Sequence, residues 1–174
     1  MKINKKKGIL FWITGISGSG KTTISKKIFN QIKNKYGKTI LLSGDDLRSF
    51  FNLKKYSKID RYIIALGYSK FCKKITNQGI NVIFATVSMS HKIRKYNSKN
   101  IENYFEIYIK SDLGKIIKKN KKKIYFKKNK NIVGIDIKAE LPKKPKILIN
   151  NDFSKSIKFL SNELIKKIYK KIPL

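Results

Sequence analysis

The chain has 174 residues, 41% hydrophobic and 11% aromatic, which excludes an intrinsically disordered protein and predicts one domain with an apolar core. Lysine and arginine number 42 against 10 acidic residues, so the formal net charge is +32 and polyanions are attracted without regard to sequence. Because the lysines are spread along the whole chain, we favour a general compositional bias over a dedicated nucleic-acid surface.

The N-terminal end, with its basic start and the apolar run Ile9–Thr14, resembles a secretory signal. Glycines and the letters GKTT follow this run in place of a small-residue cleavage site, and no apolar stretch is long enough to span a bilayer. We therefore interpret Ile9–Thr14 as a buried first strand. Cys72 is the single cysteine, so the chain cannot form an internal disulfide, which favours a reducing, cytoplasmic setting. We expect its side chain to pack on the inner face of its helix.

Helix and strand patterns alternate in the first half of the chain. Ile24, Ile28 and Ile32 recur every four residues and predict one face of a helix. A second strand is expected over Thr39–Ser43, where it ends at the letters SGDD. A long helix follows over about Lys58–Gln78, closed by the glycine after it.

The second half of the chain adds three expected strands, with the sequences NVIFATVS, YFEIYI and KILIN. It ends in a predicted amphipathic helix, about Ser154–Lys171, whose inner side carries Ile157, Leu160, Leu164, Ile165 and Ile168. This alternation predicts an α/β fold of three layers around a five-stranded parallel sheet, with residues 1–174 as a single domain. The irregular segment of about 119–140 is expected to be a mobile lid over a site.

The stretch from Gly15 to Thr22, GISGSGKT, fits the phosphate-binding loop pattern G-x-x-x-x-G-K-[ST], with an apolar strand before it and a helix after it. Glycines let the backbone curl until successive N–H groups face phosphate oxygens. Lys21 is expected to hold the β- and γ-phosphates, and the Thr22 hydroxyl to hold Mg²⁺. The residues predicted to bind ATP are Gly15, Ser17, Gly18, Ser19, Gly20, Lys21, Thr22 and Thr23. A flexible Gly/Ser turn is the alternative.

Two of the ten acidic residues, Asp45 and Asp46, stand side by side where the second strand is expected to end. Open α/β sheets bind their ligands at this edge, and phosphoryl transfer needs a carboxylate that orients the acceptor hydroxyl and takes its proton. Asp45 is the candidate for this role and Asp46 the second choice. The alternative is that the pair caps the following helix.

Arginine is rare in this lysine-rich chain. Only Arg48, Arg61 and Arg94 are present among the 42 basic residues. Where lysine is the default, an arginine indicates a need for the planar, bidentate guanidinium group, with chance as the alternative.

Five motifs together resemble those of the adenylylsulfate (APS) kinases, in order and with nearly the same spacing. They are FWITGISGSGKTT, SGDDLR, Asp60-Arg61, GINVIFATVS and the GID of residues 134–136. The resemblance runs from about Gly8 to Asp152. It implies a P-loop kinase that moves the γ-phosphoryl group of MgATP onto the ribose 3′-hydroxyl of a small nucleotide, and it makes a homodimer possible.

The same resemblance implies roles for individual residues. Asp45 would act as the base and Arg48 would grip the nucleotide substrate. The pair Asp60–Arg61 would follow the family's acceptor turn, and the turn's aromatic, here Tyr56, would stack on the substrate base. Arg94 falls on a motif arginine as well, so all three arginines of the chain occupy motif positions.

Departures from the family pattern cluster on the acceptor side. Ser43 replaces the first aspartate of the family's DGD motif, and Ile64–Gly67 replaces an arginine-rich stretch. The segment Thr86–His91, which contains the substrate-position residue Ser88, is altered. The stretch Lys119–Tyr125 lacks the family's lid motif, and the next stretch is about four residues shorter than the family pattern.

Ile132 replaces an aromatic residue, so half of a base-stacking pair is expected to be lost, an interaction worth roughly 1–3 kcal/mol. Intact phosphate chemistry with altered acceptor contacts indicates a change of specificity. The TVSM segment and the altered stretch after Asp60–Arg61 look similar to the cytidine diphosphoramidate kinases of bacterial capsule biosynthesis, so the acceptor is either adenylylsulfate or, slightly favoured, a cytidine diphosphoramidate-type nucleotide.

Two other classes of function stay open. A catalytically impaired nucleotide-binding regulator is indicated by Ser43 and the altered lid, and a nucleic-acid-binding P-loop protein by the net charge of +32. His91 would either meet a phosphate or phosphoramidate oxygen or begin an exposed helix. The terminal helix is expected to pack on the sheet instead of lying on a membrane.

Overall fold

A computed structural model describes residues 3–119 and 131–173 of the chain. The strands in these ranges are β1 (Leu10–Thr14), β2 (Thr39–Ser43), β3 (Asn81–Thr86), β4 (Tyr104–Lys110) and β5 (Ile147–Asn150). The helices are α1 (Lys21–Tyr36), α2 (Gly44–Phe50), α3 (Lys58–Asn77), α4 (His91–Asn100), α5 (Leu113–Lys118) and α6 (Ile157–Lys171).

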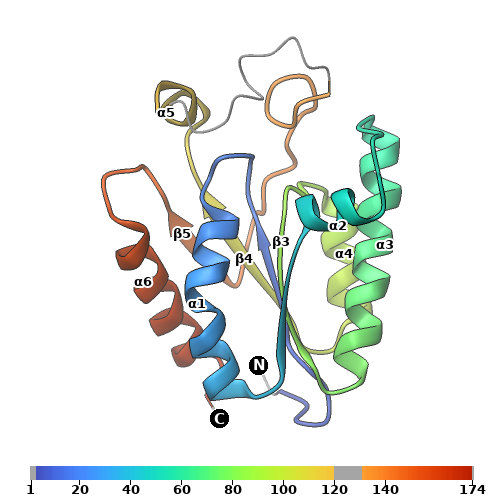
Figure 1. The fold of residues 1–174 in the computed structure, drawn as a ribbon, viewed down its shortest axis with the longest axis vertical. Coiled ribbons are helices and arrows are strands. Elements are labelled where there is room, and N and C mark those ends of the chain that lie inside the picture. The colour runs from blue at the N-terminus through green and yellow to red at the C-terminus, as the bar shows by residue number, and fades with distance from the viewer. Residues whose placement is uncertain (1–2, 120–130, 174) are drawn as a thin grey trace.

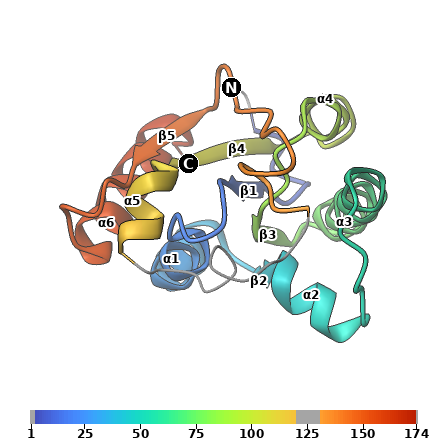
Figure 2. The same cartoon turned by 90° about the horizontal axis from the view of Figure 1, so that it is seen from above.

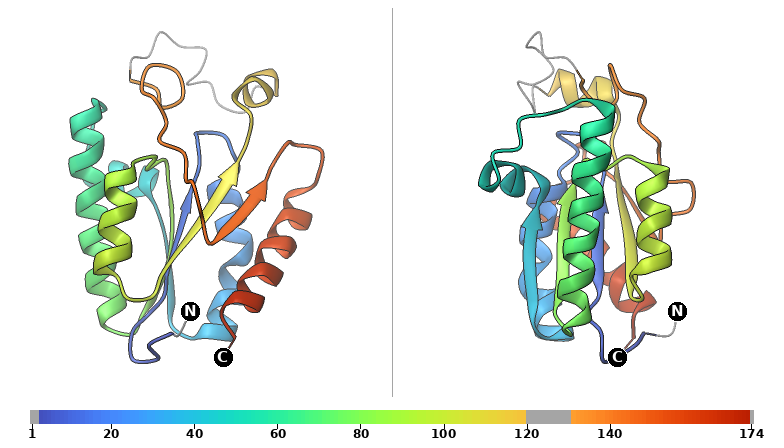
Figure 3. Two further views of the ribbon diagram at one scale, coloured as in Figure 1. Left: turned by 180° about the vertical axis from the view of Figure 1, so that it is seen from behind. Right: turned by 90° about the vertical axis from the view of Figure 1, so that its right-hand side faces the viewer.

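The five strands form one parallel sheet, as predicted, and their order in it is β2-β3-β1-β4-β5. Helices α1 and α6 cover one face and α3 and α4 the other, so the molecule has three layers (Figure 1). Parallel strands end at the same edge of a sheet, and the loops that follow β1, β2 and β3 therefore meet there (Figure 2). Helix α5 and the segment that starts at residue 131 lie above this edge (Figure 3).

The central strand β1 contributes to both apolar layers. Phe11 and Ile13 are fully buried on the side of α1 and α6, whereas Leu10 and Trp12 are fully buried on the side of α3 and α4. Side chains alternate along a strand, so a strand covered on both faces requires a continuous apolar run. Trp12 stacks on Phe84 of β3 with ring centroids 4.9 Å apart. The strand that leads into the phosphate loop is thus held from both sides.

The third strand ends at Thr86, two residues earlier than predicted. Thr86 is the last residue paired with β1, opposite Thr14. Beyond it the chain turns, because the Thr14 hydroxyl donates to the carbonyl of Ser88 at 3.2 Å and the Met89 N–H donates to the carbonyl of Val87 at 3.1 Å. The turn leaves Ser88 at the edge of the sheet where ligands bind.

The final helix also begins later than predicted, at Ile157 and not at Ser154. The Ser156 hydroxyl caps it by accepting the N–H of Phe159 at 3.2 Å. Ser154 bonds instead to the carboxylate of Asp152. The predicted stop of the long helix is confirmed, because the glycine after Gln78 has a φ of 78°, in the left-handed region.

Helices α2, α4 and α5 have 7, 10 and 6 residues. From the sequence, α2 and α4 are expected only in the alternative interpretations of Asp45–Asp46 and of His91, and α5 is not predicted. Short helices carry too few apolar residues for a clear periodic pattern. In the described ranges, no helix combines the length and apolar character that crossing a bilayer needs.

Candidate active site

The phosphate loop connects β1 to α1 and depends on its glycines. A Cβ at Gly15 would lie 2.5 Å from the carbonyl oxygen of Ile109, a distance that no side chain can occupy. Gly18 and Gly20 have φ values of 80° and 92°, in the left-handed region that favours glycine. The motif therefore specifies a backbone shape that other residues would strain.

Two polar side chains of this loop are buried. Lys21, the first residue of α1, donates from Nζ to the carbonyl of Ile16 at 2.8 Å. The buried hydroxyl of Ser19 has no hydrogen-bond partner among residues 3–119 and 131–173. A buried polar group without a partner costs about 1–3 kcal/mol, and a bound phosphate oxygen would supply that partner.

Asn151 supports the loop from the end of β5. Its buried side chain donates from Nδ2 to the carbonyl of Ser19 at 3.0 Å. A Cβ at Gly20 would approach the same Nδ2 to 3.1 Å. The sequence does not predict this contact, because Asn151 lies 132 positions from Ser19 and belongs to no motif.

Strand β2 leads directly into α2. The hydroxyl of Ser43 accepts the N–H of Asp46 at 3.1 Å and so caps this helix. Asp45 and Asp46 lie in its first turn and are exposed, where the helix dipole favours carboxylates. The capping role proposed as the alternative for the two aspartates therefore belongs to Ser43. Asp45 faces the pocket, whereas Asp46 is absent from the described lining residues.

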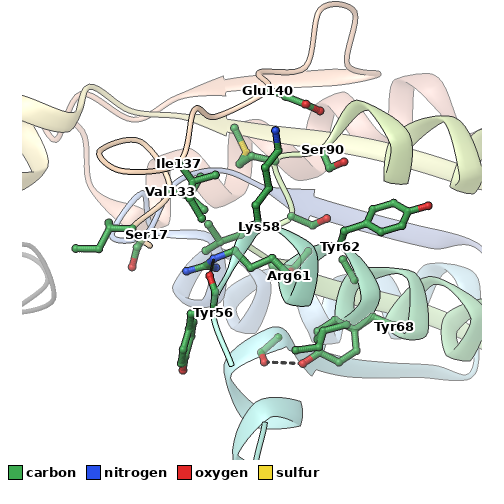
Figure 4. A pocket seen from close by; sticks show the side chains of 18 of the residues that line it. Ser17, Tyr56, Lys58, Arg61, Tyr62, Tyr68, Ser90, Val133, Ile137 and Glu140 are labelled. Carbon is green, nitrogen blue, oxygen red and sulfur yellow. Dashed lines mark hydrogen bonds between the residues drawn. The ribbon is translucent and has the colours of Figure 1, made fainter. Parts of the chain in front are cut away.

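A pocket of about 540 Å³ opens between the phosphate loop, α2, α3, the turn after β3 and the segment 131–140. Figure 4 shows that Ser17 and Tyr68 lie at opposite ends of this pocket, with Val133 and Ile137 on one wall. The predicted site residues that line it are Ser17, Asp45, Arg48, Tyr56, Arg61, Ser88 and Ile132. The fold thus brings together residues that the sequence places in five separate segments.

Ser88 and Tyr68 are two of the hydroxyl-bearing residues that line the pocket. Ser88 is buried, and within the described ranges its hydroxyl has no hydrogen-bond partner. The Tyr68 hydroxyl donates to the carbonyl of Gly44 at 3.3 Å (Figure 4). Burial raises the pKa of Tyr68, while the charges of Arg48 and Asp45 act on it in opposite directions. Tyr68 therefore remains a protonated donor at neutral pH.

Tyr56 contacts both arginines of the pocket. Its ring centroid lies 4.3 Å from the guanidinium carbon of Arg48 and 5.2 Å from that of Arg61. These are cation–π distances, and the ring is still 42% exposed. Burial lowers the pKa of Arg61, and the neighbouring charge of Arg48 lowers it further. Two guanidinium groups this close together favour an anionic ligand.

Comparison with known proteins identifies the family, since the model of the adenylylsulphate kinases matches residues 7–150. The chain belongs to the adenylylsulphate kinase family. It is 38% identical to a cytidine diphosphoramidate kinase of Campylobacter jejuni over 94% of this chain and 98% of that protein. It is 28% identical to a probable adenylyl-sulfate kinase of Archaeoglobus fulgidus over 82% of this chain and 96% of that one. The predicted resemblance and the prediction of a phosphotransferase are both confirmed.

Solved structures confirm the P-loop fold. The APS kinase of Mycobacterium tuberculosis in complex with AMPPNP and APS has a TM-score of 0.81 and 24% identity, covering 93% of this chain and 98% of that one. The crystal structure of APE1195 also has a TM-score of 0.81, with 25% identity and coverage of 97% and 98%. The fold of this chain is therefore the one on which adenylylsulphate kinases are built.

Arg94, a motif position of the adenylylsulphate kinases, does not line the described pocket. It is buried on α4, and its Nε lies 3.6 Å from the Glu106 carboxylate. His91 is exposed at the start of α4, where its Nδ1 lies 2.6 Å from a terminal nitrogen of Arg94. Of the two readings of His91, the structure supports the exposed helix start.

The predicted lid lies only partly in the described ranges, since residues 120–130 fall outside them. Residues 131–140 form a wall of the pocket, and Ile132 is buried there. The GID motif makes a tight turn, in which the Asp136 carboxylate accepts the N–H of Ile132 at 2.8 Å and Gly134 has a φ of 97°. A Cβ at Gly134 would contact Ile16, so this turn sits against the phosphate loop.

Several residues of the pocket belong to none of the sequence motifs. They are Lys58, Tyr62, Tyr68, Lys92 and Glu140. Helical spacing could have predicted two of them on α3. Lys58 lies three residues before the predicted Arg61 and four before Tyr62, so the three share one face of the helix. Lys92 and Glu140 lie on α4 and the segment 131–140, and only the fold brings these elements together.

Proposed function

We propose that this chain is a nucleotide kinase that transfers the γ-phosphoryl group of ATP to the ribose 3′-hydroxyl of a cytidine diphosphoramidate-type nucleotide. The single observation that carries the proposal is the shared pocket, which has Ser17 of the phosphate loop at one end and the proposed acceptor residues Asp45, Arg48, Tyr56 and Arg61 in its lining. Transfer requires the two reactants to meet in line within one enclosed space.

The phosphate loop and four of the pocket residues have distinct tasks in this proposal. Lys21 and the loop N–H groups hold the outer phosphates of ATP. The Asp45 carboxylate orients the acceptor hydroxyl and takes its proton as the new P–O bond forms and ADP leaves. Arg48 and Arg61 neutralise the acceptor's phosphates, and Tyr56 stacks on its base.

The residues present also fit Mg²⁺, although the described ranges hold no group of three or more acidic, cysteine or histidine side chains. In P-loop kinases the phosphates themselves complete the shell of the ion, and one hydroxyl on the loop suffices from the protein. Thr22, next to the buried Lys21, would supply it. When bound, Mg²⁺ neutralises charge on the β- and γ-phosphates.

A cytidine diphosphoramidate-type acceptor is favoured over adenylylsulfate for two reasons. The relative of that name is 38% identical over nearly the full length of both chains, against 28% for the archaeal adenylyl-sulfate kinase. On α3, the stretch Ile64–Gly67 replaces the arginine-rich stretch by which adenylylsulfate kinases contact the anhydride, with Leu66 and Gly67 at the two arginine positions. Ile64 and Ala65 of this stretch line the pocket. An acceptor with fewer negative charges on its terminal group needs fewer cations there.

The test is an acceptor panel with radiolabelled ATP and purified protein, comparing kcat/KM for cytidine diphosphoramidate, cytidine diphosphate and adenylylsulfate. We expect the highest value for cytidine diphosphoramidate, with label on the ribose of the product. A higher kcat/KM for adenylylsulfate would refute the acceptor assignment but leave the kinase assignment standing. Nucleotide binding without turnover of any acceptor would support the regulator instead.

A further inference from the structure

All three arginines of the described chain donate hydrogen bonds to backbone carbonyls of segments around the pocket. Arg48 donates to the carbonyls of residues 53 and 55, at 2.9 and 3.0 Å. Arg61 donates to the carbonyl of Tyr56 at 3.0 Å and to that of Asn131 at 2.8 Å. Arg94 donates to the carbonyl of Glu140. A guanidinium can serve two such acceptors from one rigid group, which a lysine ammonium does less well.

The last two of these contacts enclose one wall of the pocket. Arg61 holds Asn131 and Arg94 holds Glu140, so the segment 131–140 is bound at its first and last residues by arginines from α3 and α4. Between these ends the segment rests on an apolar cluster, in which Val133 packs with Met89 and Tyr108. Its inner side faces the pocket.

We propose that Arg94 is a positioning residue for the acceptor pocket: it acts without touching either substrate, by fixing the end of the segment 131–140. This inference rests on the proposed function only for its kinetic consequence. The structural part, that Arg94 restrains the segment, stands on the contacts of Arg94 alone.

The surroundings of Arg94 fit a residue that positions the segment 131–140 better than one that binds a ligand. Its side chain is only 10% exposed, and its charge is matched by the equally buried carboxylate of Glu106 on β4, at 3.6 Å. The ion pair holds the guanidinium beside β4, while one terminal nitrogen, Nη2, contacts the Glu140 carbonyl and His91. The other terminal nitrogen, Nη1, is buried with no hydrogen-bond partner among the described residues. A buried cation with this many fixed partners has little freedom to move toward a substrate.

The residue at the end of the segment adds a second link to the same place. The Glu140 N–H donates to the carbonyl of Met89 at 3.1 Å, and its carboxylate accepts the N–H of His91. Arg94 thus completes a set of contacts that join the segment 131–140 to the turn after β3 and to α4. Removing the guanidinium should loosen that junction, because only two hydrogen bonds from the described residues would then hold Glu140, and one of them is to the exposed His91.

Two variants and a matched control test whether Arg94 restrains the segment 131–140. Arg94→Lys keeps a cation beside Glu106 but cannot serve all three acceptors. The double change Arg94→Met with Glu106→Gln removes the buried charges together, so that no lone charge prevents folding. Lys95→Met, at an exposed position of the same helix, is the control. Amide hydrogen exchange of each full-length protein is measured without ligands, and KM and kcat are measured for both substrates.

We expect the amides of residues 132–140 to exchange about tenfold faster in both Arg94 variants, while β1 and α1 stay protected. KM for the acceptor should rise about tenfold, with KM for ATP and kcat nearly unchanged. Unchanged exchange in that segment, or faster exchange spread evenly over the protein, would overturn the proposal, as would equal losses for both substrates. If the unmodified protein turns over no acceptor, the proposed function fails. Hydrogen exchange then still tests whether Arg94 restrains the segment 131–140.

Discussion

The lysine and serine side chains of the site differ from the many others in the chain by their position. Lysine is common throughout the chain, yet Lys21 is buried at the start of α1 and reaches back over the phosphate loop. Serine is also common, yet the hydroxyls of Ser19 and Ser88 are buried in the site with no partner among the described residues. Buried polar groups of this kind are costly unless a ligand satisfies them.

The role of Lys21 gives the first prediction. Lys21→Ala should lower kcat by about 10³-fold or more, because a charge aimed at the transferred group acts mainly in the transition state. Steady-state assays with MgATP would measure this loss. Lys27→Ala removes an exposed lysine of the same helix and should leave the rate unchanged, and a similar loss in both variants would refute a special role for Lys21.

Asp45 gives the second prediction. Asp45→Asn should reduce kcat by about 10³-fold while the dissociation constant for ATP stays the same, since the amide cannot take the acceptor's proton. Asp46→Asn, one residue along the same turn, is the comparison and should retain most activity. If Asp46→Asn proves the more damaging change, the base is Asp46 and the assignment of Asp45 is wrong.

Glu106 gives a prediction about pH. Burial raises the pKa of Glu106 to about 6, although the charge of Arg94 partly opposes this rise. Its ordinary pKa is 4.5, so between about pH 4.5 and 6 the folded protein binds more protons than the unfolded chain, and the free energy of unfolding falls as pH rises. Relative to the double variant Arg94→Met with Glu106→Gln, the unmodified protein should lose on the order of 1 kcal/mol across this range. Urea denaturation at several pH values measures the difference, and a constant difference would contradict the raised pKa.

At the scale of single elements, helix α2 shows how a departure from a family motif can still be explained locally. Ser43 removes a carboxylate from the motif but supplies the cap of α2. Serine and aspartate are equally good caps, so the helix tolerates the exchange. The exchange therefore leaves the start of α2, and with it the position of Asp45, capped as a helix.

This view of α2 gives a fourth prediction. Ser43→Ala should lower the free energy of unfolding by about 1 kcal/mol through loss of the cap, whereas Ser43→Asp should keep it nearly unchanged. Urea denaturation of the two variants measures both values. Equal destabilisation by alanine and aspartate would show that Ser43 is held by packing and not by its capping bond.

The elements that could be predicted from the sequence are those with long or continuous patterns. The isoleucines at 24, 28 and 32 identify α1, and the run that ends at Thr14 identifies the central strand. Helix α5 could not be predicted, because its 6 residues carry one buried side chain, Ile116. The turn at Ser88 could not be predicted, because it depends on a hydrogen bond from the Thr14 hydroxyl of β1 to the carbonyl of Ser88, and the local sequence does not encode this contact.

The acceptor side of the site was predictable only through its motifs. Arg48, Tyr56 and Arg61 follow from resemblance, and the structure brings them to the same pocket. Asn151 and Glu140 could not be found in this way, because each acts on a segment that lies far away in the sequence. Contacts of this kind depend on the sheet order, which the spacing of motifs does not encode.

At the scale of the whole molecule, the net charge of +32 accompanies the fold of the adenylylsulphate kinase family. Every helix of the described ranges carries basic residues, whereas four of the five strands carry none, and the pocket gathers only a few of them. Such a field attracts anions in general and raises association rates, without selecting a sequence of bases.

The charge leads to a fifth prediction, on nucleic acid. Binding to a single-stranded RNA should be weak and should fall by about 10³-fold or more between 50 and 200 mM salt, because released counterions drive it. Fluorescence anisotropy with a labelled oligonucleotide measures this. Tight binding that resists salt would instead favour a nucleic-acid function.

The most direct measurement of the central claim is a crystal structure of the protein with a non-hydrolysable ATP analogue and cytidine diphosphoramidate. The account predicts a triphosphate held by residues 15–22, and the acceptor's ribose 3′-hydroxyl within hydrogen-bond reach of the Asp45 carboxylate. An acceptor bound outside the pocket, or with that hydroxyl turned away from Asp45, would contradict it.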